Sequence, residues 1–396
     1  MQITIERLDH MGNGIGYSNN KIVFVPKTIP GDIVNINIES ENKNYIKATV
    51  DKYIKRSDDY VESFCPYYYK CGGCSLQNLL YDKTIEYKLD RVKNILKRSN
   101  IDIDFIPIKN INDKNYRNKI ELKIVNKKIG FYEKSTHNLI EIDKCQITKN
   151  CINNFFSELK NMNIINGDVL IRCNYNEELL ISIKTKDDIK INEEVLPKYK
   201  VVGIIVNDKC VYGENKFLDL INNTFFEVSY DSFFQVNSYI NSKLFDLIKE
   251  SVQGKNILDL YSGVGTLSIM ASYSASKVYA IENIPNAVIN AIKNAKINKR
   301  DNINFILGNV EDKITKINDN IDYVIVDPPR KGLDNVTINK LLELKPNKIL
   351  YISCETQKLS EDLKYFLNDY KIEKAYMLDM FSYSYHCEVF IVLERE

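Results

Sequence analysis

The chain has 396 residues, of which 44% are hydrophobic and 27% are charged, and its formal net charge is +1. This length predicts two or three domains, and the composition is typical of a soluble globular protein. The sequence has no apolar run of about 18 residues, which excludes a transmembrane helix. Its first residues, MQITIERL, lack a basic segment followed by an apolar one, so we expect a cytoplasmic protein without a membrane partner.

The sequence contains nine cysteines but only three histidines, at His10, His137 and His386. Disulfides are rare in the cytoplasm, so the cysteine spacing indicates metal or catalytic chemistry first. Three histidines leave little material for histidine-rich metal sites or for Ser-His-Asp catalysis.

Although the net charge of the whole chain is near zero, the segment of residues 65–150 is basic. Residues 65–150 hold 17 Lys and Arg against 10 Asp and Glu. Such an excess suits a nucleic-acid partner, but a solvated lysine-rich face explains it equally well.

Residues 1–55 have the pattern of a small β domain. The turn-forming clusters MGNG, SNN and IPGD separate five short strand-like runs: ITIERL, GIGYSN, KIVFVP, DIVNINIES and YIKATVDKYI. This pattern predicts a closed barrel of the OB kind, which either binds oligonucleotides or serves as a passive spacer.

The middle of the chain is predicted to be a second, larger β domain. The segment CPYYYKCGGC, residues 65–74, holds three cysteines, and Cys145 follows in EIDKCQI. Between them, apolar residues at helical spacing predict a helix over 79–99. Residues 107–229 return to strand-like runs such as KIELKIV and VLIRC.

From about residue 230 the pattern changes to alternating strands and helices. Five apolar runs are typical of strands covered on both faces: NILDLYSG, KVYAIEN, INFILGN, DYVIVDPP and ILYISC. This alternation predicts an α/β fold with an open, mostly parallel sheet, and ligands at the carboxyl ends of its strands.

The first of these strands leads into a glycine-rich loop. In ILDLYSGVGTLSI, a strand ending at Asp259 continues through Gly263 and Gly265 into a helix. Glycines let a ligand approach the backbone, and Glu282, at the end of the next strand, can accept hydrogen bonds from ribose hydroxyls. Dinucleotide binding stays an alternative, although GVGTLS lacks the last glycine of GxGxxG. The pattern is the usual arrangement for S-adenosylmethionine, with Asn309 placed for adenine contacts.

The fourth strand ends in VIVDPPRKG. Each proline fixes φ and removes a donor, so the turn is rigid and projects the Asp327 carboxylate into the cleft. In methyltransferases this turn borders the acceptor atom. A stiff strand-to-loop junction is the alternative, which the preceding glycine loop and acid disfavour.

Cys354 follows the fifth strand, in ILYISCETQKL, and should open into the same cleft as Asp327. Buried cysteines are commonly inert, but the position of Cys354 at the end of a strand favours a reactive thiol over a packing role. Uracil C5 is a poor nucleophile; a thiolate that adds to C6 makes C5 reactive toward a methyl donor, and a base must then remove the C5 proton. Glu388 is the best candidate for that base, and His386 is a weaker one.

Together these residues resemble the RNA uracil-C5 methyltransferases of the TrmA and RumA type over nearly the whole chain. The run IVFVPKTIPGDIVNI is similar to a TRAM domain, YRNKIELKI to the family's central domain, and SFFQVN, DLYSGVGT and VDPPRKGL to its catalytic core. The likeness is closest to the 23S ribosomal RNA enzymes that carry a TRAM domain and a [4Fe-4S] cluster. It implies a TRAM domain over 1–55, a central β-rich iron–sulfur domain over 56–76 and 107–229, and a Rossmann-like class I methyltransferase domain over 77–106 and 230–396.

The resemblance also implies roles for individual residues. Cys354 would be the nucleophile, Glu388 the base, and Phe233 a contact to a base flipped out of its stack. S-adenosylmethionine would be held by six residues: Gln235, Tyr261, Glu282 and Asp327, with Thr266 and Asn309 as lesser contacts. Cysteine spacing alone leaves zinc and iron–sulfur open. The resemblance favours a [4Fe-4S] cluster on four cysteines: Cys65, Cys71, Cys74 and Cys145.

Two segments depart from the family pattern. The nucleophile motif SCNP or SCDP is SCET here, and Glu355 is expected to raise the pKa of Cys354 unless it points away. The segment before the base, roughly P-x-T-x-H-V-E in relatives, is SYSYHCE, with Ser382 and Ser384 in place of proline and threonine, and Cys387 in place of an apolar residue. Both reacting groups remain, so we expect an active enzyme.

RNA is therefore the expected partner. We expect 23S ribosomal RNA before transfer RNA, because the transfer-RNA members typically lack both the TRAM domain and the cluster. No DNA partner is expected, and the protein is expected to be a monomer. The alternative of another class is an RNA-binding or ribosome-assembly factor that keeps the fold without turnover.

Overall fold

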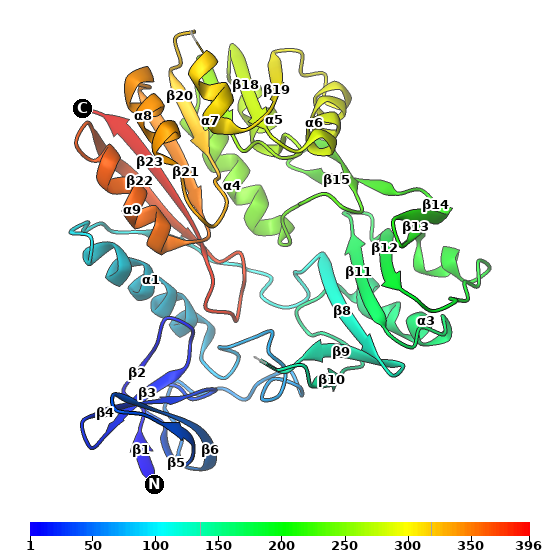
Figure 1. Ribbon diagram of the computed structural model, residues 1–396, viewed down its shortest axis with the longest axis vertical. Coiled ribbons are helices and arrows are strands. Elements are labelled where there is room, and N and C mark those ends of the chain that lie inside the picture. The colour runs from blue at the N-terminus through cyan, green and yellow to red at the C-terminus, as the bar shows by residue number, and fades with distance from the viewer. Residues whose placement is uncertain (135, 318) are drawn as a thin grey trace.

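The computed structural model describes residues 1–134, 136–317 and 319–396. Their strands form three large sheets and one two-stranded hairpin. The sheets occupy separate parts of the molecule, with the N-terminal sheet at the bottom of Figure 1 and the C-terminal sheet at the top. Within the described ranges, no helix is both long and apolar enough to cross a membrane.

The N-terminal part is a six-stranded sheet that curls into a small barrel, with the order β1-β5-β6-β4-β3-β2. Its strands are β1 (Gln2–Thr4), β2 (Arg7–Leu8), β3 (Gly14–Ser18), β4 (Lys21–Val25), β5 (Ile33–Glu41) and β6 (Tyr45–Lys55). The expected count of five strands was wrong, because the first run is divided in two. Ile5 N still bonds to Asp32 O beside β5, whereas Glu6 N bonds to Ile15 O of β3.

The central part is a seven-stranded sheet with the order β10-β9-β8-β11-β12-β13-β14. Its strands are β8 (Lys119–Val125), β9 (Lys128–Tyr132), β10 (Leu139–Glu141), β11 (Gly167–Cys173), β12 (Leu179–Thr185), β13 (Val201–Val206) and β14 (Lys209–Gly213). Alternate residues of β8, such as Ile120 and Leu122, are buried with residues of α2 (Asn150–Asn154) and α3 (Phe156–Asn161). A short 3-10 helix, Leu196–Tyr199, precedes β13. The predicted β-rich middle is therefore confirmed.

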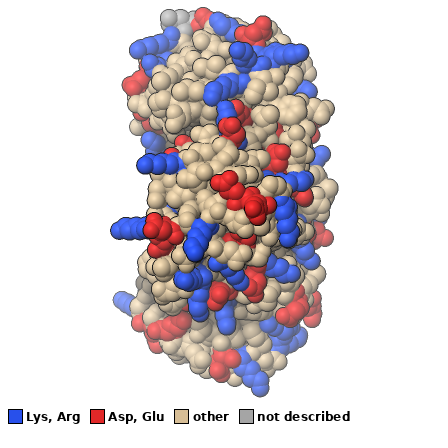
Figure 2. Space-filling view, turned by 90° about the vertical axis from the view of Figure 1, so that its right-hand side faces the viewer, with Lys and Arg blue, Asp and Glu red and all other residues tan. Residues whose placement is uncertain are grey.

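An acidic partner outside residues 65–150 offsets part of the basic excess of this segment, since Lys123 pairs with Asp168 at 2.8 Å. On the face shown in Figure 2, Lys and Arg are mingled with Asp and Glu rather than gathered into one basic patch. That face of the molecule therefore shows no single basic surface for RNA.

The C-terminal part is an eight-stranded sheet with the order β19-β18-β17-β20-β21-β23-β22-β7. Its strands are β17 (Asn256–Leu260), β18 (Lys277–Glu282), β19 (Ile303–Leu307), β20 (Tyr323–Val326), β21 (Lys348–Ser353), β22 (Tyr370–Leu378), β23 (Glu388–Arg395) and β7 (Ile106–Ile108). The first five in the order are parallel, and β23 is antiparallel to both of its neighbours. The predicted, mostly parallel α/β sheet is confirmed. Because β7 joins this sheet, the proposed domain boundary between residues 106 and 107 falls inside a strand.

Helices cover both faces of this sheet. One face packs against α4 (Ser238–Ser251), α5 (Thr266–Ser272), α6 (Pro285–Ile297) and the hairpin of β15 (Lys216–Ile221) and β16 (Thr224–Ser229). The other face packs against α1 (Tyr81–Lys97), α7 (Val310–Lys313), the 3-10 helix Ile314–Lys316, α8 (Asn335–Leu344) and α9 (Thr356–Phe366). The helix expected over 79–99 is α1, and it lies between the barrel and this sheet in Figure 1.

Candidate active site

A cavity of about 650 Å³ lies at the carboxyl ends of β17, β18, β20 and β21. This is the edge at which parallel α/β sheets bind ligands. Its wall brings together eight residues that the sequence singled out: Phe233, Gln235, Tyr261, Glu282, Asp327, Cys354, His386 and Glu388.

The loop after β17 has an uncommon backbone. Tyr261, Gly263 and Gly265 have positive φ, at 62°, 55° and 82°, and a tyrosine with such a φ is strained. The loop is fastened to the end of β18, because both carboxylate oxygens of Glu282 accept backbone hydrogen bonds. The donors are Gly263 N at 2.9 Å and Ile284 N at 2.8 Å. Glu282 is thereby held in a fixed orientation at the cavity wall.

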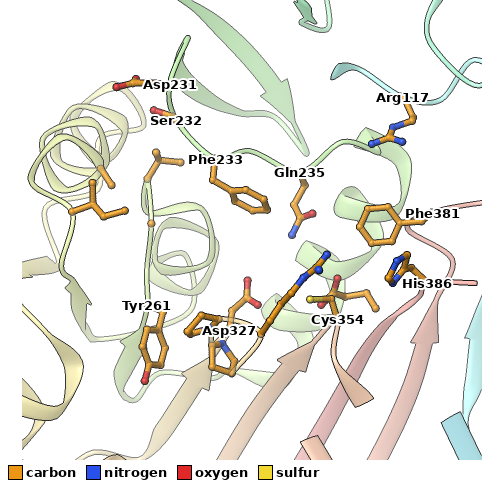
Figure 3. Close-up of a pocket in the computed structure, with 18 of the residues that line it drawn as sticks. Arg117, Asp231, Ser232, Phe233, Gln235, Tyr261, Asp327, Cys354, Phe381 and His386 are labelled. Atoms are coloured by element: carbon orange, nitrogen blue, oxygen red, sulfur yellow. The ribbon is translucent and has the colours of Figure 1, made fainter. Parts of the chain in front are cut away.

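Phe233 and Gln235 reach the cavity from the segment before α4. Figure 3 shows their side chains facing the end of β20, where Asp327 lies. Phe233 is 75% exposed, which is unusual for so large an apolar side chain. Two prolines follow Asp327 and stiffen the opposite wall. The cavity thus has an aromatic ring and an amide on one side and a carboxylate on the other.

Cys354 directly follows strand β21, and Glu388 is the first residue of the adjacent strand β23. Ser353 of β21 pairs with Val389 of β23 in an antiparallel register. Cys354 is the residue after Ser353 and Glu388 is the residue before Val389, so each lies next to one member of a pair whose Cα atoms are roughly 4.5 to 5.5 Å apart. Both side chains line the cavity, so a thiol and a carboxyl group share one wall.

Burial makes both groups hard to ionise. Burial first, and then Glu388 and Asp327, raise the pKa of Cys354 to about 11, while Arg330 lowers it. Burial, and then Asp327, raise the pKa of Glu388 well above its usual range, and burial raises that of Asp327 to about 7. Burial therefore disfavours the ionised forms of both groups in the free site, and a nearby positive charge favours those forms.

His386 is the weaker base of the two candidates. Burial first, and then Arg330 and Arg91, lower the pKa of His386 to about 4. Its ring packs against that of Tyr385, with centroids 4.0 Å apart. A group with so low a pKa holds a proton poorly at neutral pH, so Glu388 is the stronger proton acceptor.

Glu355 does not act on the thiol as expected. It is the N-cap of α9, and its Oε1 accepts a hydrogen bond from Gln357 N at 3.4 Å. The acids that raise the pKa of Cys354 are Glu388 and Asp327. The pKa of Cys354 is therefore raised by burial and by these two acids, while the glutamate of SCET caps a helix, which is the exception that the expectation allowed.

The serines of SYSYHCE order the segment before Glu388. Ser382 donates to Asp379 Oδ2 at 2.7 Å. Ser384 donates to Phe381 O at 2.9 Å and accepts from His386 N at 3.2 Å. Hydrogen bonds therefore fix a segment in which the family pattern has proline and threonine.

Two of the predicted cofactor contacts, Thr266 and Asn309, are not in the lining of the larger cavity. Thr266 is the first residue of α5. Asn309 is exposed at the start of α7, and its amide oxygen is 3.4 Å from the side-chain nitrogen of Asn283. Neither is among the described residues that line the larger cavity. A contact with them requires a ligand that extends past Glu282 toward β19.

The cavity also contains residues that the sequence did not single out. Arg330 follows the two prolines in VDPPRKG, Arg117 belongs to YRNK, and Phe381 precedes the serines. Arg117 Nε is buried without a partner among the described residues. Arg330 could have been predicted, because it directly follows the prolines of VDPPRKG, a motif already expected at the cavity. Nothing local distinguishes Arg117 from the other basic residues of its segment.

A second cavity, of about 80 Å³, adjoins the first and shares Gly73, Arg117 and Ile147 with it. Its lining includes all four cysteines that the sequence grouped: Cys65, Cys71, Cys74 and Cys145. Among the residues that the structure describes, this lining contains no His, Asp or Glu, so the thiols are the strong metal ligands that these residues offer.

These thiols suit a sulfur-ligated group. Burial, and then the neighbouring thiols, raise the pKa of Cys65, Cys71 and Cys74, so thiolates there require a cation between them. Across the described part of the chain, no three Cys, His, Asp or Glu side chains converge closely enough for one metal ion.

Comparisons with known proteins agree over the whole chain. Residues 176–396 match the family model described as tRNA (Uracil-5-)-methyltransferase, and residues 1–50 match the TRAM domain. An uncharacterized RNA methyltransferase of Caldanaerobacter subterraneus is 34% identical, with 100% of this chain and 98% of the relative covered. One from Clostridium acetobutylicum is 31% identical, with 100% and 96% covered.

A solved structure is similar throughout. It is the Pyrococcus abyssi tRNA (uracil-54, C5)-methyltransferase in complex with S-adenosyl-L-homocysteine, which is 26% identical and has a TM-score of 0.79, with 99% of this chain and 100% of that chain covered. The expected class I methyltransferase fold with an N-terminal TRAM barrel is confirmed, and so are S-adenosylmethionine as the methyl donor and RNA as the substrate class. The chain belongs to the family of S-adenosylmethionine-dependent RNA (uracil-C5)-methyltransferases.

Proposed function

We propose that this enzyme methylates C5 of a uridine in RNA through a covalent bond between Cys354 and C6 of the base. The observation that carries the proposal is that Cys354, directly after β21, and Glu388, the first residue of the neighbouring strand β23, line one cavity with Asp327. Uracil C5 is a poor nucleophile, so the reaction needs a thiol to activate the ring and a base to release the product.

The thiolate of Cys354 adds to C6, and the electrons of the C5=C6 bond move toward O4 to form an enolate. S-adenosylmethionine, when bound, supplies an electrophilic methyl group on a positively charged sulfur. C5 of the enolate forms a bond to that methyl carbon as the bond between the methyl carbon and the sulfur breaks, and S-adenosylhomocysteine leaves with the electron pair of the broken bond. Glu388 then accepts the C5 proton, the C5=C6 bond re-forms, and the C6–Sγ bond breaks to return the thiolate.

The raised pKa values bear on when the site becomes reactive. Burial and neighbouring acids disfavour the thiolate of Cys354 and the carboxylate of Glu388. A positive charge beside Asp327 lowers the pKa of all three groups. Arg330 already acts in this sense on Cys354, and a bound sulfonium adds to it. We therefore infer that the thiol ionises mainly when the methyl donor is present.

The methyl donor is proposed to lie along the wall between Glu282 and Asp327. Two backbone amides fix Glu282 and leave it lone pairs for ribose hydroxyls. The ring of Tyr261 offers a flat apolar surface, while Gln235 offers an amide donor and acceptor opposite Asp327. The remaining proposed contacts, Thr266 and Asn309, would meet the far end of the ligand.

The RNA side of the cavity is proposed to receive a flipped uracil. Phe233 presents an exposed aromatic face at the cavity wall, and such faces stack on bases taken out of a helix. Arg117, with its unpaired Nε at the junction of the two cavities, is suited to a phosphate of the same RNA.

We further propose that the smaller cavity holds a [4Fe-4S] cluster on its four cysteines. Such a group supplies the positive charge that buried thiolates need, and it would tie the loop 65–74 to Cys145. The methyl transfer described above involves no electron transfer, so the cluster has a structural role in this proposal.

For the substrate we propose 23S ribosomal RNA, on the basis of the TRAM domain and the four-cysteine cavity. Transfer RNA is the second candidate, favoured by one observation. The Pyrococcus abyssi enzyme, which is named for uridine 54 of transfer RNA, matches 99% of this chain. The expectation that transfer-RNA enzymes lack this architecture therefore does not separate the two substrates.

The test is methyl transfer from labelled S-adenosylmethionine to ribosomal RNA and to transfer RNA, each purified from cells that lack this gene. We expect labelled 5-methyluridine in ribosomal RNA, with none in transfer RNA and none with Cys354→Ala. Label in transfer RNA alone would select the second candidate. RNA binding without label in either class would favour the binding-factor alternative.

A further inference from the structure

A buried ion pair fastens one loop of the active site to helix α1. Lys88 of α1 and Asp379, which follows β22, are both 0% exposed and contact each other. They are 291 residues apart in the chain. Burying two charges is costly, so such a pair persists only where further partners satisfy both groups.

The pair is embedded in a hydrogen-bond network. Tyr81 and Ser382 each donate a hydroxyl hydrogen bond to Asp379 Oδ2 at 2.7 Å. Lys88 Nζ donates to Asp379 Oδ1 and to Phe381 O, the latter at 3.0 Å. Asp379 therefore receives three donors, and the cation of α1 also holds the backbone of the loop itself.

A third segment, after β7, completes the network. Asn110 N donates to Tyr81 OH at 2.9 Å, and Asn110 Nδ2 donates to Ser382 Oγ at 3.0 Å. Asp379 N donates to Ile108 O at 3.0 Å. Three segments that are distant in the sequence are thus joined at one buried point.

This network ends at the cavity wall. Phe381, Ser382, Ser384 and His386 all line the larger cavity, and Figure 3 shows Phe381 and His386 next to Cys354. The opposite wall depends on other contacts, because backbone amides of the loops after β17 and β18 hold Glu282. Neither Lys88 nor Asp379 lines the cavity.

We propose that Lys88 and Asp379 are positioning residues for the RNA side of the active site. Their ion pair sets the place of the loop Phe381–His386, and so the fit of the uracil against Cys354 and Glu388, without affecting the methyl-donor side. The inference rests on the proposed function of this cavity. A buried ion pair that only stabilises a fold can be replaced by uncharged residues of similar volume without loss, so an uncharged replacement separates positioning from stability.

The test is the double variant Lys88→Met with Asp379→Asn, which removes both charges and nearly keeps the shape of both side chains. We expect it to fold and to bind S-adenosylmethionine within twofold of wild type. Amide hydrogen exchange of residues 379–387 should become at least tenfold faster, and adduct formation with 5-fluorouridine RNA at least tenfold slower. The matched control is Lys93→Met on the same helix, which breaks an exposed ion pair with Asp104, a residue beyond the end of that helix, and should change none of these quantities.

Exchange and adduct rates equal to wild type in the double variant would overturn the proposal. The proposal would also be overturned if the affinity for S-adenosylmethionine fell by as large a factor as the rate of adduct formation, because that would mean general destabilisation. If the double variant does not fold, Tyr81→Phe removes one hydroxyl from the network, and about threefold changes in the same two rates are expected; unchanged rates would then overturn it. Hydrogen exchange does not depend on the reaction, so a wild-type protein that forms no adduct would refute the proposed function separately from the positioning of the loop.

Discussion

Cys354 directly follows β21 and Glu388 begins β23, and these two strands pair in opposite directions. β23 is antiparallel to β21, so its first residue lies at the same edge of the sheet as the last residues of the parallel strands. A parallel final strand would have started at the other edge, far from the thiol. The reversal of this one strand therefore places a carboxyl group beside the nucleophile.

Glu388→Gln should separate the two halves of the reaction. The amide keeps the size of the side chain but cannot take the C5 proton, so the methylated adduct should form and then persist. Turnover should fall by roughly 10²- to 10⁴-fold. Gel mobility of the protein–RNA adduct in single-turnover reactions measures this. His386→Gln is the comparison, since the pKa of His386 is lowered to about 4; turnover lost there but kept in Glu388→Gln would reverse the assignment.

The thiol of the free protein should react slowly at neutral pH. Because the pKa of Cys354 is raised to about 11, its thiolate fraction should rise about tenfold for each pH unit between 7 and 10. Alkylation by iodoacetamide, followed on the peptide that contains Cys354, measures this slope. Bound S-adenosylmethionine should speed the reaction at fixed pH. A rate that is flat above pH 8 would mean that the thiol is already ionised.

Asp259→Asn should stabilise the protein in a pH-dependent way. Asp259 is fully buried, and burial raises its pKa to about 7. In the unfolded chain the pKa of an aspartate is about 3.9, so Asp259 stays protonated to higher pH in the folded state than in the unfolded state. The wild-type protein therefore loses stability as pH rises from about 4 through 7. The asparagine variant avoids that loss, so its advantage should grow across this window, to at most about 4 kcal/mol above pH 8. Thermal unfolding at several pH values tests this; an advantage independent of pH would contradict the assigned charge.

Cys71→Ser should remove the group held by the smaller cavity. We expect loss of iron and of brown colour, and a lower unfolding temperature of the central part, because three remaining thiols bind a cluster weakly. Cys210→Ser is the matched control, since Cys210 is exposed and lies outside that cavity. Zinc in the purified wild-type protein, with a featureless visible spectrum, would exclude the iron–sulfur proposal.

The sequence predicted those features of the site and of the sheet that depend on residues close together in the chain. The strand ends at Asp327 and Cys354 and the acid at Glu282 predicted one shared cavity, and all three line it. The parallel sheet followed from apolar runs of strand length. These features depend on residues near one another in the chain, so periodicity and spacing are enough to find them.

Long-range relationships could not be predicted from the sequence. The contact between Lys88 and Asp379 joins positions 291 residues apart, and no local pattern marks either residue. The role of Glu355 was missed because a carboxylate after a strand can face a thiol or cap a helix, and only the backbone decides. Splitting of the first strand at Ile5 likewise depends on which neighbouring strand the chain meets.

The most direct test of the central claim is the mass of the Cys354 peptide after incubation with S-adenosylmethionine and RNA containing 5-fluorouridine. Fluorine takes the place of the C5 hydrogen and cannot be removed by a base as that proton is, so the covalent adduct should be trapped. We predict a methylated fluorouridine nucleotide attached to Cys354, and no adduct with Cys354→Ala. Methylation of ordinary RNA without any trapped adduct, or an adduct on a different cysteine, would contradict the mechanism.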